Sequence, residues 1–279
     1  MAPAKIKEIM TKEEFELFKD YFHNLTGNLL RESQIKIVST KLKQRLESLG
    51  LNSYKDYYRR LQEDEGERQR FIDLMTVLET SFFRGGVSFK YFSEKIINEL
   101  KLKSRVKIWS AGCATGQEPY SIAMILKGKV LGKIEILATD INTMALKKAR
   151  LGVYKESEVK GVPQFFLKYF EKVENYYWVK EEIKKIINFR YHNLLDPIGL
   201  TNYFDVIFCR NVLIYFSDEA KIRALNLFWD ALISSGYLII SEAETLKGFE
   251  PKFEMILPSV YRKKEEKGMI EKLEIPLIE

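Results

Sequence analysis

The stretch that most constrains the fold is residues 106–124, which read VKIWSAGCATGQEPYSIAM. A short apolar run meets a loop of small residues at 110–116, and Glu118 and Pro119 then open a helix. Pro119 suits the first helical turn, because its missing N–H would have no partner there. A strand that leads through a small-residue loop into a helix N-terminus is how α/β domains hold nucleotide-like ligands. The stretch therefore predicts an α/β domain with a ligand site at this loop.

The two glycines of the loop, Gly112 and Gly116, narrow the choice of ligand. Their G-x-x-x-G spacing does not match the G-x-G-x-x-G fingerprint of dinucleotide sites. No lysine follows Gly116 in the register of a phosphate-cradling P-loop. An adenosine-type ligand without a pyrophosphate is consistent with this loop, and S-adenosylmethionine fits that description.

The composition limits the class of protein further. The 279 residues suffice for one large and one small domain, and 46% hydrophobic with 30% charged residues is typical of a soluble chain. No segment approaches the roughly 20 apolar residues of a membrane span, and the N-terminus lacks the apolar core of a signal peptide. Cys113 and Cys209 are far apart, and the only histidines are His23 and His192. We therefore expect a cytoplasmic protein without membrane insertion and without a metal.

The first part of the chain has helical periodicity. Thr11 and Glu14 form a capping box before a run of phenylalanines, and Gly27 is expected to end that helix. The next helix is expected to end at Gly50, and another is predicted over 67–79. The predicted division is an N-terminal helical domain at 1–79, a linker with the first helix of the next domain at 80–104, and a Rossmann-like domain at 105–279.

After residue 103 the pattern changes to alternating strands and helices, which is typical of a parallel, doubly wound sheet. The strand candidates are 106–110, 134–139, 187–191, 205–209, 236–241 and a weaker pair near 259–263 and 269–275, with helices at 118–127, 142–151 and 218–234. Aromatic and charged residues at 153–186 interrupt the alternation and predict a small inserted β-subdomain. The predicted fold class is α/β, a Rossmann-like domain with an inserted β-subdomain, preceded by an all-helical domain.

Polar side chains follow three of these strands, where open α/β sheets bind their ligands. Asp140 lies 24 residues after Gly116 (140 − 116), close to the spacing of about 20 expected for an acid that accepts ribose hydroxyls. Its alternative role is to cap the next helix, which Asn142 can do alone. Asn211 can offer both a donor and an acceptor to a ligand. Glu244 is expected to support the site from behind.

A further motif, TSFFRGG at 80–86, lies between the helical region and the α/β domain. Arg84 presents a planar fork that matches a carboxylate. The alternative is a hinge with a solvated arginine and two core phenylalanines.

Residues 31–60 carry eight Lys and Arg against three acids, a local charge of +5. Such a basic surface is typical of proteins that bind nucleic acid or an acidic protein. The alternative interpretation is a helix surface that contacts only solvent.

Taken together, these segments resemble the chemotaxis receptor glutamate methyltransferases of the CheR type, in the order of that family and over residues 12 to 262. The matching segments are TSFFR at 80–84, WSAGCATGQEPYS at 109–121, ATDI at 138–141, NLL at 193–195, FCRNVLIYF at 208–216 and ETL at 244–246. Departures are Gly85, Leu78, Gln117 and the pair Asn28-Leu29, where the family often has Glu, Asn, Glu and Gly-Ile.

The resemblance implies a cytoplasmic, monomeric enzyme that methylates glutamates on the cytoplasmic domain of methyl-accepting chemotaxis receptors at membrane arrays. S-adenosylmethionine would be the donor and S-adenosylhomocysteine the product, and neither a metal nor nucleic acid is implied. The implied catalytic residues are Arg84 and Tyr215. The expected cofactor contacts are Thr80, Arg84, Gly112, Glu118, Asp140, Asn193, Leu194, Asn211 and Val212. The implied receptor-facing residues are Lys36, Lys41, Lys43 and Arg45.

The chemistry agrees with the scarcity of histidine. A glutamate carboxylate has an unperturbed pKa near 4.3, so it is ionised at pH 7 and needs no general base. A semi-apolar pocket with Tyr215, Phe82 and Phe83 is expected, because the charges of carboxylate and sulfonium cancel in the transition state. Two alternatives stay open: a methyltransferase acting on RNA or a small molecule, and a non-catalytic module that binds the cofactor as a signal.

Overall fold

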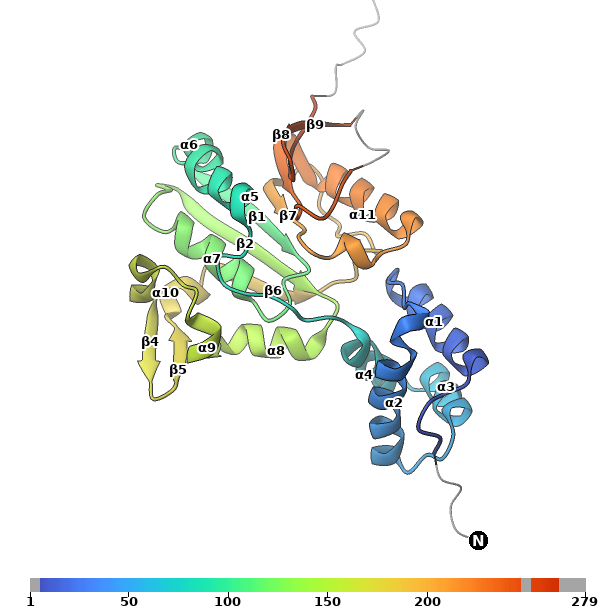
Figure 1. The fold of residues 1–279 in the computed structure, drawn as a ribbon. Helices are drawn as coiled ribbons and strands as arrows, with labels where there is room; N and C mark the ends of the chain where they lie inside the picture. Colours follow the sequence, from blue (N-terminus) through green and yellow to red (C-terminus); the bar gives the residue numbers. More distant parts are fainter. Residues whose placement is uncertain (1–5, 247–251, 266–279) are drawn as a thin grey trace, which may run out of the picture.

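The structure is a computed structural model that describes residues 6–246 and 252–265. Four helices form the N-terminal part: α1 (Lys12–Thr26), α2 (Ile35–Leu49), α3 (Tyr54–Glu63) and α4 (Glu65–Met75), with the short η1 (Glu32–Gln34) before α2. They surround an apolar core with Phe18, Leu42, Tyr57 and Phe71 at its centre. Figure 1 shows this helical domain at one end of the molecule.

The helix ends follow local sequence signals. Thr11 and Glu14 form the expected capping box, and Gly27 and Gly50 end α1 and α2 in the left-handed conformation. The helix expected over 67–79 stops at Met75 instead. At this end of the helix, the Asn142 side chain donates one hydrogen bond to the Asp73 carbonyl at 2.9 Å and another to the Thr76 hydroxyl oxygen at 2.7 Å.

A seven-stranded sheet forms the centre of the molecule, in the order β6-β2-β1-β7-β8-β10-β9. The strands are β1 (Arg105–Ala111), β2 (Lys133–Asp140), β6 (Ile187–Tyr191), β7 (Phe204–Phe208), β8 (Leu232–Ile239), β9 (Phe253–Leu257) and β10 (Val260–Lys263). Neighbours from β6 to β8 are parallel, and β10 is antiparallel to both β8 and β9. The predicted parallel, doubly wound sheet is therefore confirmed.

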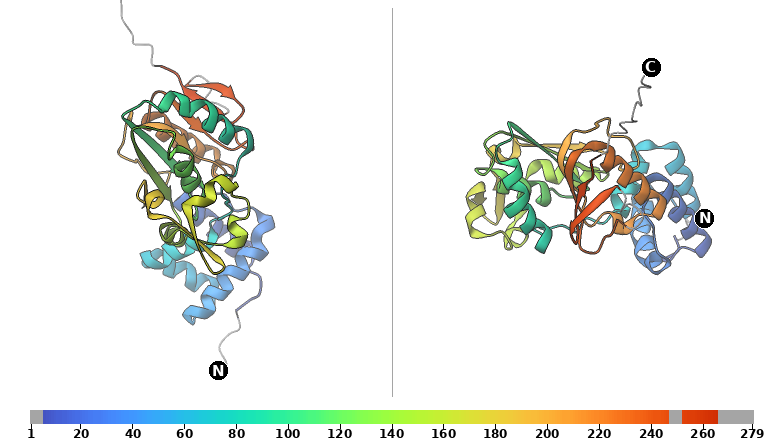
Figure 2. Two further views of the ribbon diagram at one scale, coloured as in Figure 1. Left: turned by 90° about the vertical axis from the view of Figure 1, so that its left-hand side faces the viewer. Right: turned by 90° about the horizontal axis from the view of Figure 1, so that it is seen from above.

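Helices pack on both faces of this sheet. On one face lie α7 (Gln117–Leu126) and the continuous helix made of α5 (Gly86–Tyr91), the π-helical η2 (Phe92–Ile96) and α6 (Ile97–Leu100). On the other face lies α11 (Asp218–Ala231), preceded by the short η4 (Leu213–Tyr215). Figure 2 shows this layering from two further sides. The helix α8 (Thr143–Leu151) follows β2 and contacts α4.

Two expected element boundaries need correction, and one strand was not predicted. The helix expected over 218–234 ends at Ala231, and β8 begins at Leu232, four residues before the expected strand. On the side away from β8, β10 pairs with β9, a strand that was not predicted. The expected strand at 269–275 lies outside the described residues.

The interruption in the α/β alternation is a second, three-stranded sheet in the order β3-β5-β4. Its strands are β3 (Val153–Lys155), β4 (Phe170–Val173) and β5 (Tyr176–Val179), with α9 (Glu156–Val159), η3 (Gln164–Tyr169) and α10 (Glu181–Lys184). The inserted β-subdomain is thus confirmed. Within the described residues, none of the helices has the length and apolar character that a membrane crossing requires.

Candidate functional site

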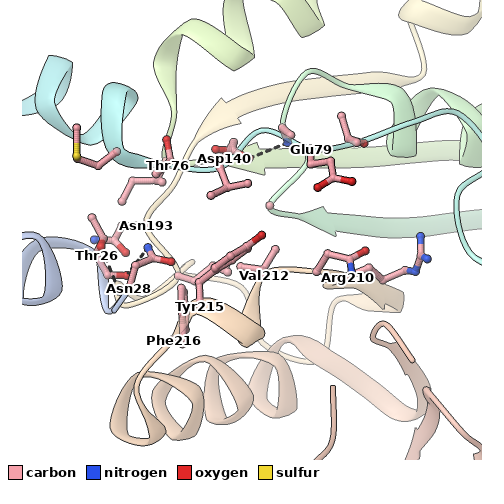
Figure 3. A pocket seen from close by; sticks show the side chains of 18 of the residues that line it. Thr26, Asn28, Thr76, Glu79, Asp140, Asn193, Arg210, Val212, Tyr215 and Phe216 are labelled. Carbon is pink, nitrogen blue, oxygen red and sulfur yellow. Dashed lines mark hydrogen bonds between the residues drawn. The ribbon is translucent and has the colours of Figure 1, made fainter. Parts of the chain in front are cut away.

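A pocket lies where the carboxyl ends of β1, β2 and β7 face the helical domain (Figure 3). All ten residues predicted to bind the cofactor or to act in catalysis line it: Thr80, Arg84, Gly112, Glu118, Asp140, Asn193, Leu194, Asn211, Val212 and Tyr215. Asp140 stands on one side of the pocket and Tyr215 on the other (Figure 3). The tertiary structure thus gathers residues from five separate segments at the edge where open α/β sheets bind ligands.

Asp140 ends β2 with both carboxylate oxygens accepting backbone hydrogen bonds. The Ala114 N–H donates to one oxygen at 2.7 Å and the Asn142 N–H to the other at 2.8 Å. Asn142 caps α8 by accepting from the Ala145 N–H, as expected, so Asp140 is not required as the helix cap. Burial raises the pKa of Asp140 to about 6, although these hydrogen bonds favour the ionised form. The carboxylate therefore joins the glycine loop to the start of α8 and keeps lone pairs for a ligand.

The small-residue loop after β1 turns tightly because its backbone adopts conformations that favour glycine. Gly112 has φ +81°, and a Cβ there would lie 2.4 Å from Val212 Cγ2. Ala114 is also left-handed, with φ +46°. The loop can therefore approach the 210–212 segment only because its residues are small.

An ion pair between Glu118 and Arg210 forms the inner wall of the pocket. Arg210 Nη1 lies 3.3 Å from Glu118 Oε2, and Ser110 Oγ donates to Glu118 Oε1 at 2.8 Å. Burial raises the pKa of Glu118, and Arg210 opposes that shift. Arg210 Nη1 also donates to the Arg84 carbonyl at 2.6 Å. Sequence reasoning did not assign Arg210 a role in the site, although it directly precedes Asn211.

Arg210 also explains why glycine stands at position 85. Gly85 has φ +114°, and a Cβ at this position would lie 1.9 Å from Arg210 Nη2. The guanidinium occupies the space that any side chain at position 85 would need. The departure from the family pattern at Gly85 is thus compatible with the pocket and is required by this packing.

Glu244 holds the loop that carries Asn211 and Val212. Its carboxylate accepts from the N–H groups of Asn211 at 3.2 Å, Val212 at 2.9 Å and Ile214 at 3.3 Å. It also accepts from the N–H and the hydroxyl of Ser241, both at 2.7 Å. Asn211 adopts the unfavourable φ of +60°, which these hydrogen bonds stabilise. Glu244 supports the site from behind, as the sequence predicted.

The helical domain supplies one side of the pocket, which the sequence did not indicate. The Leu29 N–H donates to the Tyr215 carbonyl at 2.7 Å, and the Ser217 N–H donates to the Gly27 carbonyl at 3.0 Å. Asn28 and Phe216 form an isolated antiparallel bridge between these bonds. The lining residues from this domain are Phe22, Thr26, Asn28, Leu29, Leu30, Gln34, Met75, Thr76, Val77 and Glu79. A local sequence signal for this contact is lacking, because the two segments are nearly 190 residues apart (216 − 28 = 188).

The 80–84 segment contains three residues that line the pocket, Thr80, Ser81 and Arg84, and two phenylalanines that pack elsewhere. Arg84 is about one-third exposed, and its Nη1 donates to the Glu79 carbonyl at 2.7 Å. Phe82 packs edge-on against Tyr154, and Phe83 stacks on Phe166 at 4.6 Å between ring centroids. The expectation that both phenylalanines line the pocket is wrong, because they anchor the segment to the β-subdomain side. Phe89 supplies an aromatic wall in their place.

His192 and the two cysteines can be placed as well. His192 lines the pocket, and burial lowers its pKa. Cys113 and Cys209 are buried, and burial raises the pKa of both thiols, which disfavours the nucleophilic thiolate. Among the described residues, no three His, Cys, Asp or Glu side chains are grouped so that they could hold a metal ion.

The four basic residues predicted to face a receptor lie on α2, outside the pocket. Arg45 makes two hydrogen bonds to the buried Glu67, at 2.8 and 2.5 Å. Lys41 Nζ donates to the Leu74 carbonyl at 2.6 Å, and Lys43 pairs with Glu8 at 2.8 Å. Lys36 is exposed. The structure therefore gives Arg45 and Lys41 roles inside the helical domain and leaves Lys36 facing solvent.

The fold and the pocket define the class: an S-adenosylmethionine-dependent methyltransferase preceded by a helical domain. Comparison with known proteins agrees, because residues 78–261 match the family described as CheR methyltransferase, SAM binding domain, and residues 13–76 match CheR methyltransferase, all-alpha domain. The chain belongs to the CheR methyltransferase family.

Curated relatives match nearly the whole chain. A chemotaxis protein methyltransferase of Borreliella burgdorferi is 34% identical over 270 residues, which cover 91% of this chain and 95% of that protein. One of Vibrio parahaemolyticus is 35% identical over 259 residues, covering 88% of this chain and 94% of that protein. Chemotaxis protein methyltransferase 1 of Pseudomonas aeruginosa is 33% identical over 268 residues, covering 90% and 98%.

Proposed function

We propose that this enzyme transfers the methyl group to glutamate side-chain carboxylates on cytoplasmic helices of chemotaxis receptors, forming methyl esters. The observation that carries the proposal is the placement of Arg84 and Tyr215 in one pocket with the predicted cofactor contacts. The names of the curated relatives, chemotaxis protein methyltransferases, support the receptor as substrate.

The residues of the pocket suit S-adenosylmethionine. Asp140 would accept from the ribose hydroxyls, Gly112 gives the backbone close access, and Asn211 and Val212 would meet the adenine side. Thr80, Arg84 and Glu118, with Asn193 and Leu194, complete the set. The buried Nε of Arg210 and Nε2 of His192 lack a protein partner within the described residues, as groups turned toward a polar ligand would. S-adenosylmethionine supplies an electrophilic methyl group on a sulfonium.

The task of the chain is positioning and partial desolvation, not proton transfer. An acceptor glutamate with a pKa near 4.3 arrives ionised, so no residue has to remove a proton. Arg84 would orient a carboxylate through its planar fork, and Tyr215 would close the acceptor side of the pocket. The apolar wall formed by Phe89, Leu30 and Phe216 limits ground-state stabilisation of the opposite charges.

The receptor would approach the side of the pocket that the helical domain builds. Receptor methylation helices carry glutamate and are acidic, and the exposed Lys36 on α2 would speed their encounter. In this proposal 1–79 forms the receptor-facing domain, 80–104 the linker with the first helix, and 105–279 the catalytic domain. The enzyme acts as a cytoplasmic monomer at receptor arrays.

The test is methyl transfer from tritiated S-adenosylmethionine to a receptor cytoplasmic fragment, followed by peptide mapping. A glutamate methyl ester releases volatile tritiated methanol in base, whereas a methylated amine or nucleobase does not. We expect base-labile label on glutamate-containing helical peptides, and none on the same fragment with its mapped glutamates changed to alanine. Base-stable label, label on RNA only, or cofactor binding without transfer would contradict the proposal.

A further inference from the structure

Within the residues that the structure describes, one face of the sheet is open over the amino ends of β6, β2 and β1. In a doubly wound sheet both faces carry crossover helices, since strand side chains need cover. The opposite face of these strands is covered by α7 and α8. The crossover from β6 to β7, residues 192–203, contains no helix anywhere along its length. Leu194 of this crossover packs in the same cluster as Trp109, and Leu200 and Tyr203 line the edge of the uncovered part.

The uncovered part of this face is a groove of about 310 Å³, lined by residues from β1, β2, β6 and the crossover. Leu137, Leu200 and Phe204 give it an apolar floor. Tyr203 stands at one wall, with Lys107 Nζ 3.5 Å from its ring centroid. None of the residues that line this groove also lines the pocket.

The rim of the groove is positively charged. Four cationic residues line it, Lys107, Lys133, Lys185 and Arg190, against one acid, Glu135. Glu135 is already engaged, because Lys133 Nζ lies 2.5 Å from its carboxylate and Arg105 3.7 Å away. Lys185 and Arg190 are exposed and have no carboxylate within ion-pair distance in the part of the chain that the structure describes. A net charge of three positive units (4 − 1) therefore surrounds an apolar floor.

We propose that this groove, which we call the open sheet face, docks an acidic amphipathic helix of a partner protein. An amphipathic helix would place its apolar stripe on Leu137 and Leu200 and its carboxylates toward Lys185 and Arg190, covering the strands as a crossover helix does elsewhere. Nucleic acid fits less well, because single strands bind through several stacking aromatics and Tyr203 is already covered by Lys107. The inference does not rest on the proposed substrate.

The test uses the full chain and a fluorescent synthetic peptide of about 18 residues, with leucines at helical spacing and glutamate elsewhere. The test variant is Lys185→Glu with Arg190→Glu. The matched control is Lys90→Glu with Lys95→Glu, two exposed lysines on the helix that packs on the opposite face. We expect the test variant to bind the peptide at least about tenfold more weakly and the control to stay within about twofold.

Three further measurements test where the peptide binds and whether the variants stay active. Amide exchange should slow in residues 133–137 and 185–190 when the peptide binds. The rate of methyl transfer to a receptor fragment should stay within about twofold of the unmodified enzyme in both variants. The peptide-binding result can still be interpreted if the receptor fragment is not a substrate. A Lys36→Glu variant detects peptide that binds α2 instead.

Several outcomes would overturn the proposal. These are absence of peptide binding, equal losses in the test and control variants, and a loss caused by Lys36→Glu alone. A single-stranded oligonucleotide of equal charge serves as a competitor to the peptide. If it binds more tightly than the peptide and its binding also depends on Lys185 and Arg190, the partner is not a protein helix.

Discussion

The backbone N–H of Leu29 donates to the carbonyl of Tyr215 across the boundary between the helical and catalytic parts of the chain, with 2.7 Å between the two atoms. The neighbouring Asn28–Phe216 bridge extends this contact. The loop that carries the proposed acceptor-side tyrosine is therefore positioned by the helical domain. A receptor that binds this domain would meet a catalytic loop that is already held in place.

Arg84 can be tested without disturbing the core, because it is partly exposed and its side chain is held by the neighbouring Glu79. We expect Arg84→Ala to lower kcat/KM for receptor methylation by about 100-fold, since a carboxylate loses its orienting fork. Arg84→Lys keeps the charge and should recover only a minor part of the activity. Near-normal turnover of a folded Arg84→Ala variant would remove Arg84 from the mechanism.

Asp140 predicts a pH dependence of cofactor affinity. Its pKa is raised to about 6 by burial, and ribose hydroxyls would donate to its ionised form. As the pH falls through 6 the carboxyl takes up a proton, so affinity for S-adenosylhomocysteine should fall by about tenfold between pH 7.5 and pH 5. Calorimetry across this range measures the effect. Affinity that stays constant down to pH 5 would show that the ionised carboxylate does not hold the ligand.

Glu244 and its exposed neighbour Glu242 form a matched pair for testing the loop support. Glu244→Gln removes the charged acceptor of three loop N–H groups, and we expect the free energy of unfolding to fall by about 3 kcal/mol. Cofactor affinity should also fall, because Asn211 and Val212 lie on that loop. Glu242→Gln should change neither quantity. Equal effects of the two substitutions in denaturant titrations would disprove the assigned support.

Alanine substitutions at two glycines with positive φ distinguish the cost in stability of backbone strain from that of a steric clash. Gly50→Ala introduces only the strain of the left-handed conformation, since no atom lies within 4 Å of the added Cβ. Gly85→Ala adds a clash with the Arg210 guanidinium and should cost at least about 1 kcal/mol more. It should also weaken cofactor binding by displacing Arg210 from Glu118. If thermal unfolding and cofactor binding change equally in both variants, Arg210 does not occupy that space in solution.

The basic residues of α2 should separate into surface and structural groups. Lys36→Glu should slow receptor methylation by about fivefold at low salt and much less at high salt, because exposed charges are screened. Arg45→Met should instead lower the free energy of unfolding by about 3 kcal/mol, since it leaves Glu67 buried without its partner. Initial rates at two salt concentrations and urea titrations distinguish these effects. A salt-dependent rate loss in Arg45→Met with unchanged stability would reverse the assignment.

Much of this architecture could be predicted because its signals are local. The capping box at Thr11 and Glu14, the glycines that end α1 and α2, and the alternation of strands and helices each depend on residues a few positions apart. The same holds for the loop at Gly112 and the acid at the end of β2, because the carboxyl ends of parallel strands meet at one edge. The full set of ten pocket residues came from the family resemblance, and their roles in binding and catalysis stay predictions.

Other features depended on contacts between distant segments. Leu29 reaches Tyr215, Glu244 accepts from the 211–214 loop, and Arg210 fills the space beside Gly85, all across long separations in sequence. Burial by the fold, not residue type, turned Phe82 and Phe83 away from the pocket and paired Arg45 with Glu67. Periodicity and capping report the conformation of one segment. Which side chains share a buried space depends on the packing of the whole chain, and only the tertiary structure decides it.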